Sequence, residues 1–143
     1  MKKLQLTNII TIGIILLILS ITVILGIGEL KKIGTQDDDW IAFGLIPLIF
    51  TIIAIWYLKI AIKVYKSEKS EGKIMKISSW INLVNLPIII LFLIISIIGF
   101  SQGGDPLGWA ILLYFTFIIV LPLFLISFIL FLIGKRKLFT TQK

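Results

Sequence analysis

Four long segments with almost no charged side chains limit how this chain can fold. They cover about residues 4–28, 40–60, 77–100 and 109–134 of the 143 residues. The first of them, as a helix rising about 1.5 Å per residue, is about 37 Å long and exceeds the roughly 30 Å hydrocarbon core of a bilayer. We therefore expect an all-α integral membrane protein with four transmembrane helices, forming a single domain over residues 1–143.

The overall composition fits lipid as the main solvent. Hydrophobic residues make up 59% of the chain and charged residues only 15%, which leaves too little polar surface for a soluble domain of this length. The net charge of +7 does not indicate nucleic-acid binding, because the basic residues sit at the ends of apolar segments and form no basic face with interleaved aromatics. The sequence thus predicts a membrane domain and no separate soluble domain.

Basic residues predict the orientation of the four spans. Residues 59–76 hold six lysines, and with Lys2, Lys3 and the basic residues after 134 they make 12 of the 14 basic residues. Positive charge is retained on the cytoplasmic side, so residues 61–76 should form a cytoplasmic loop between two helical hairpins. Both termini should then be cytoplasmic in a multi-pass protein of a plasma (inner) membrane, with the acidic connection 29–39 outside.

The basic start before an apolar run also fits a signal peptide. We favour a retained first span, because its charge-free run is longer than the roughly 7 to 15 residues of a typical signal core.

Polar residues inside the apolar segments mark faces that should pack against protein. Asn82 and Asn85 are the most polar groups of the third span, and amides in lipid need partners, so both should point inward. A similar narrow seam in the fourth span comprises Thr116, Val120, Leu123, Ser127, Leu130 and Gly134. We take as helix-packing or pore candidates the residues Asn82, Asn85, Ser96, Thr116 and Pro122.

Two features at the inner side leave alternatives open. Pro87 either kinks one continuous third helix or opens the spanning helix after an interfacial stretch from 77 to 86; we favour the kink. Lys59, Lys63 and Lys66 follow one another at helical spacing beside an aromatic pair, so they either hold lipid headgroups or act only as topology signals.

The spans show none of the chemistry that membrane enzymes and proton-coupled transporters use. Apart from Lys59 at the inner end of the second span, they carry no charged group, and the chain has no cysteine and no histidine. The aspartates at 37–39 lack the spacing, central glycine and closing glutamate of an EF-hand. We therefore expect no catalytic residue, no cofactor, no metal and no enzyme activity.

These observations favour a non-catalytic accessory, scaffold or immunity-type protein that acts through contacts within the membrane. Its expected partners are membrane lipids and either a membrane-protein partner or further copies of itself, without nucleic acid. The alternative is a small oligomeric channel or transporter whose pathway passes Asn82, Asn85, Ser96, Thr116 and Pro122. Polar faces that converge on one hydrated cavity would favour the alternative, and faces that interlock without water would favour the accessory protein.

Overall fold

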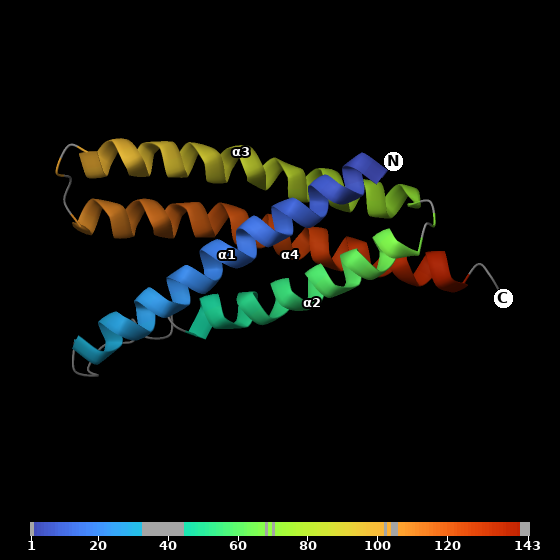
Figure 1. Ribbon diagram of the computed structural model, residues 1–143, viewed down its shortest axis with the longest axis horizontal. Helices are drawn as coiled ribbons and strands as arrows, with labels where there is room; N and C mark the ends of the chain where they lie inside the picture. The colour runs from blue at the N-terminus through green and yellow to red at the C-terminus, as the bar shows by residue number, and fades with distance from the viewer. Residues whose placement is uncertain are drawn as a thin grey trace. The chain divides into compact units, whose positions relative to one another are not determined.

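The computed structural model contains long helices and no strand in the part of the chain that it describes, which is residues 2–32, 45–67, 69, 71–101, 103 and 106–140. Side chains are described there except for residues 25–32, 96, 100 and 106–115. Four helices follow one another along the chain (Figure 1): α1 (Lys2–Lys32), α2 (Ile46–Lys66), α3 (Lys73–Ser101) and α4 (Pro106–Thr140).

All four helices are long and apolar enough to cross a membrane. The spanning segments are Lys2–Ile24, Ile46–Lys66, Lys73–Gly99 and Thr116–Thr140. This confirms four all-α candidate spans. Several helices run past the expected hydrophobic limits, because backbone hydrogen bonding continues into the flanking basic residues: α2 reaches Lys66 and α4 passes through Lys135 to Thr140.

Proline positions are compatible with these helices. Pro47 lies in the first turn of α2, where its missing N–H removes no intrahelical bond. Pro87 lies inside α3 and Pro122 inside α4, and each helix continues through its proline. The third span is therefore one helix from Lys73 to Ser101 without a break at Pro87.

The chain divides into two compact units. Unit 1 comprises Met1–Asn8 and Lys69–Lys143, and it contains the first turns of α1 together with α3 and α4. Figure 1 shows α3 and α4 side by side along their lengths. They run antiparallel, because Met75 at the start of α3 meets Gly134 near the end of α4 while Ser78 meets Ser127.

Buried side chains in unit 1 lie on one face of each long helix. On α4 the spacing of three and four residues brings large aromatics inward along with the predicted seam. Among the residues of unit 1 the buried hydrophobic side chains are Met75, Ile89, Val120, Leu121, Phe124, Phe128 and Phe131. The opposite faces expose isoleucine and leucine, as expected for helices solvated by lipid.

Unit 2 comprises Ile9–Glu68, which is most of α1 and all of α2. Each helix again has one buried stripe at helical spacing. On α1 it contains Thr11, Ile12, Ile15, Leu19 and Thr22, and on α2 it contains Pro47, Ala54, Tyr57, Ile60, Ala61 and Val64. The hydroxyls of Thr22 and Thr51 bond back to the carbonyls of Ile18 and Pro47, so neither polar group remains unsatisfied in an apolar helix.

Some predicted features fall outside the described residues. They are the part of the acidic connection beyond Lys32, the first residues of the second span at 40–44, and the side chain of Ser96.

Candidate functional site

Buried polar side chains gather on one face of α3 near its start. Ser78, Asn82 and Asn85 are separated by four and three residues, which places them on one side of the helix. All three are completely buried, as is the adjacent Ser79. Both asparagines thus point inward, as their position in an apolar span requires.

Asn82 connects α3 to the first turns of α1. Its side-chain N–H donates to the side-chain carbonyl of Asn8 at 2.7 Å, and Asn8 is itself buried. The Asn85 amide lies 3.5 Å from the Asn82 carbonyl, the outer limit of a hydrogen bond. The Asn85 carbonyl oxygen is buried without a hydrogen-bond partner. The side-chain amides of Asn8 and Asn82 are therefore joined directly, and Asn85 keeps an acceptor oxygen without a partner.

Ser78 and Ser127 connect α3 to α4 by a reciprocal pair of hydrogen bonds. The Ser78 hydroxyl donates to the Ser127 carbonyl at 2.6 Å, and the Ser127 hydroxyl donates to the Ser78 carbonyl at 2.9 Å. Small residues allow this close approach, since a Cβ at Gly134 would overlap the Met75 side chain and lie 3.1 Å from the Met75 nitrogen. The two backbones meet as they do at other small-residue interfaces in membranes.

Glu71 is the buried carboxyl of this region. It precedes α3, and only 5% of its surface is exposed. Burial raises the pKa of the Glu71 carboxyl above its ordinary value, while Lys76, a side-chain hydrogen bond from Gln5 and the nearby Ser79 lower it less strongly. Ser79 is close enough to act on the charge, yet Ser79 Oγ and Glu71 Oε2 have no hydrogen bond of regular geometry.

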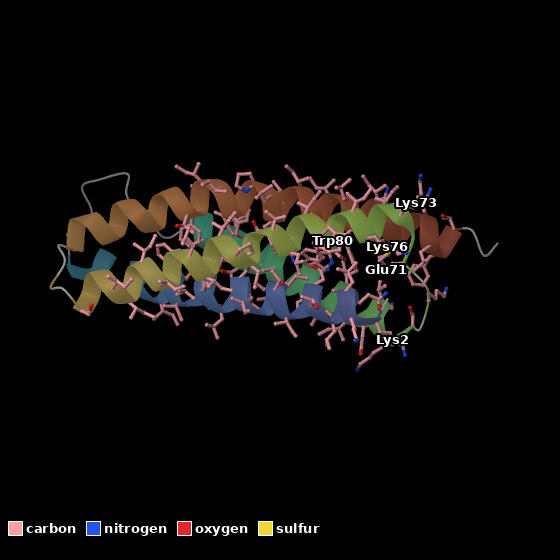
Figure 2. The ribbon with its side chains drawn as sticks, turned by 90° about the horizontal axis from the view of Figure 1, so that it is seen from above. Lys2, Glu71, Lys73, Lys76 and Trp80 are labelled. Carbon is pink, nitrogen blue, oxygen red and sulfur yellow. The ribbon has the colours of Figure 1, made fainter. Side chains whose placement is uncertain are left out.

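Basic side chains surround this end of unit 1. Figure 2 shows Lys2, Lys73 and Lys76 at the same end as Glu71. Lys69 lies between α2 and α3, and its ammonium is 4.4 Å from the centre of the Phe139 ring of α4. This contact connects the residues before α3 to the end of α4. The buried carboxyl therefore lies beneath a basic surface.

In unit 2 the predicted lysine stripe lies on an exposed face. Lys59, Lys63 and Lys66 are all exposed, and Trp56 continues the same face one turn earlier with 55% of its surface exposed. Ile60, Ala61 and Val64 are buried on the opposite side. An exposed tryptophan followed by lysines is the arrangement found where helices leave the hydrocarbon for the headgroups.

The other site candidates belong to the later part of α3 and to α4. Thr116 is half-buried, Pro122 is exposed on α4, and the Ser96 side chain lies outside the described residues. Sequence reasoning overlooked Gln5, Glu71 and Ser79. The spacing of Gln5 and Asn8 by three residues was a usable signal, because it puts two amides on one face at the start of α1.

Within the described ranges no group of three or more acidic, histidine or cysteine side chains could hold a metal ion. Comparison of the chain with protein-family models, with curated proteins and with solved structures gives no match.

Proposed function

We propose that this chain is a small non-catalytic membrane protein that acts through lateral contacts, as an accessory subunit, a scaffold or an immunity-type protector. The observation that carries the proposal is the direct polar bonding between helices, Asn82 to Asn8 and Ser78 to Ser127. Such contacts fix helix positions and place few polar groups where a solute would pass.

The proposed arrangement is two hairpins with both termini in the cytoplasm. Its support is the basic end of unit 1, where the starts of α1 and α3 and the end of α4 carry Lys2, Lys73 and Lys135. Basic residues collected at one end of antiparallel helices are what retention on the cytoplasmic side of a plasma (inner) membrane produces.

The lipid-facing surfaces offer the contacts that such a protein needs. Large apolar side chains are exposed on every helix, including Ile10, Ile55, Leu91 and Ile129. In lipid these faces gain little by association from the hydrophobic effect alone, so a partner must be recognised by shape and close packing. A membrane-protein partner or a second copy of the chain would dock there, and lipids would cover the rest.

A photo-reactive residue placed at each of those four exposed positions in native membranes tests the proposal. At some of these positions we expect a cross-linked product of discrete mass. The cross-linked partner should be one protein, which is either another membrane protein or a second copy of the chain. The buried Ile89 serves as the control and should give no intermolecular adduct. Adducts with lipid alone at all four positions would contradict the proposal.

The second candidate is a small oligomeric channel or transporter. The observation that favours it is the Asn85 carbonyl oxygen, which is buried in an apolar helix without a hydrogen-bond partner. A solute or water in a pathway would supply that partner. Solute flux in proteoliposomes that disappears in Asn85→Leu, with the fold retained, would replace the accessory function by this one.

A further inference from the structure

We propose that Glu71 is a proton-binding site, and that the bound proton holds the first two turns of α1 against the start of α3. The proposed function does not require this site, and the site can exist in a channel as well as in an accessory protein. The ligand is the proton itself, taken from the aqueous phase at the basic end of unit 1.

The surroundings of Glu71 favour its neutral form. A charged carboxylate requires several hydrogen-bond donors or water when it leaves the aqueous phase, and an isolated buried charge is costly. Glu71 Oε2 is buried and has no hydrogen-bond partner, although the buried Ser79 hydroxyl lies near it and is equally unpaired. A proton on the carboxyl removes the charge and turns one oxygen into a donor, so less solvation is lost.

Positive charges near the carboxyl oppose protonation but do not outweigh burial. Those acting on it are Lys76 from α3 and the chain's amino terminus before α1, and both lower the pKa of Glu71. Desolvation is the largest contribution, so the pKa remains above the ordinary value. A bound metal cation would meet the same two positive charges without the proton's covalent bond, which makes the proton the preferred ligand.

Glu71 is linked to α1 through Gln5, so the state of the carboxyl acts on the docking of α1. The Gln5 bond by itself favours the carboxylate, but the burial of Glu71 in the docked state favours the proton more strongly. Gln5 and Asn8 lie on one face of α1, and both are buried; Gln5 bonds to the Glu71 carboxyl and Asn8 to Asn82. If Glu71 ionises, its carboxylate gains by reaching water, and the Gln5 contact is lost with the movement. Residues 2–8 then lose the Gln5 contact, while the Asn8–Asn82 bond remains.

The direction of the pH effect follows from the raised pKa. The folded, docked state binds the proton more tightly than an open state with an ordinary carboxyl does. The contribution of Glu71 to docking is therefore complete below the ordinary glutamate pKa and is lost as the pH rises through the raised value. Lower pH tightens the start of α1, and higher pH loosens it.

The first experiment labels the unmodified full-length protein in lipid vesicles with dicyclohexylcarbodiimide, an apolar reagent that adds to protonated carboxyls. Mass spectrometry then measures modification of Glu71 and of Glu68 across a pH series. We expect Glu71 to remain reactive at higher pH than Glu68. Loss of reactivity of both carboxyls over the same pH range would overturn the proposal, and this experiment requires no variant to fold.

The second experiment measures amide hydrogen exchange in residues 2–8, corrected for the intrinsic pH dependence of exchange. Protection should fall with rising pH in the wild type and in the matched control Glu68→Gln. In Glu71→Gln, which keeps the size of the side chain but cannot ionise, protection should stay constant with pH. The proposal fails if the wild type shows no such fall, or if Glu71→Gln shows the same fall.

Discussion

Asn82 of α3 donates a 2.7 Å side-chain hydrogen bond to Asn8 of α1, and both amides are buried in helices that consist mainly of apolar residues. The bond joins residues 74 positions apart in the sequence. It holds the chain's first turns in the same unit as its last two helices.

Breaking this pair tests its energetic value. Asn82→Leu should destabilise the protein by about 1–3 kcal/mol, because it takes the Asn82 donor away from the buried side-chain carbonyl of Asn8. The double variant Asn8→Leu/Asn82→Leu should lose less than the sum of the single variants, since interhelical polar couplings in membranes reach about 1.7 kcal/mol. Unfolding in mixed micelles measures both, and Val84→Leu on the exposed face of α3 should change stability by less than about 0.5 kcal/mol. Additive losses would show that the two amides are not coupled.

The burial of Asn82 was predicted from the sequence, whereas the burial of Glu71 was not. Asn82 lies in an apolar segment, where an amide has to face protein whatever its partner is. Glu71 lies in a segment of six lysines and two glutamates, which has the composition of a solvated loop. Glu71 contacts Gln5, 66 residues earlier, and local composition carries no information on that contact.

A related limit applies to α4. Of the seam predicted there, Val120, Ser127 and Gly134 are buried, whereas Thr116, Leu123 and Leu130 are half-buried. Phe124, Phe128 and Phe131 are buried as well. A helix that is apolar on all sides has no polar face to reveal its inner one, so volume filling decides which aromatics turn inward.

The contact at Gly134 predicts a second stability effect. Gly134→Ala should destabilise the protein by about 1–3 kcal/mol, because the new Cβ would overlap the buried Met75 side chain where α4 packs against α3. Gly13→Ala is the matched control, since a Cβ at Gly13 meets nothing within 4 Å. That change should be neutral or stabilise α1 by up to about 1 kcal/mol. Equal effects of the two substitutions in the same unfolding assay would contradict this account of the α3–α4 contact.

Orientation is tested by reporter fusions. Fusions after Lys143 and near Ser70 should report the cytoplasm, and one near Gln36 should report the outside, because 12 of the 14 basic residues would then be cytoplasmic. A cytoplasmic signal from the Gln36 fusion would reverse this assignment.

The exposed lysine face of α2 predicts a dependence on lipid charge. Lys59, Lys63 and Lys66 should hold the following loop to an anionic surface, with about 1 kcal/mol per basic residue. In vesicles the loop should therefore be cut more slowly by protease in anionic than in zwitterionic lipid. High salt and the triple change of these lysines to glutamine should both remove the difference. Equal cleavage in both lipids would leave these lysines as topology signals alone.

The choice between an interlocked polar core and a solute pathway is tested most directly by water access to Asn85. The chain has no cysteine, so Asn85→Cys and Val120→Cys each carry a single thiol for a charged, membrane-impermeant thiol reagent. Both side chains are buried, so neither thiol should react from either side of a vesicle, whereas Lys73→Cys, at an exposed position, should react fully. Rapid modification of both Asn85→Cys and Val120→Cys in the folded protein would reveal a hydrated path through the helices and contradict the accessory function.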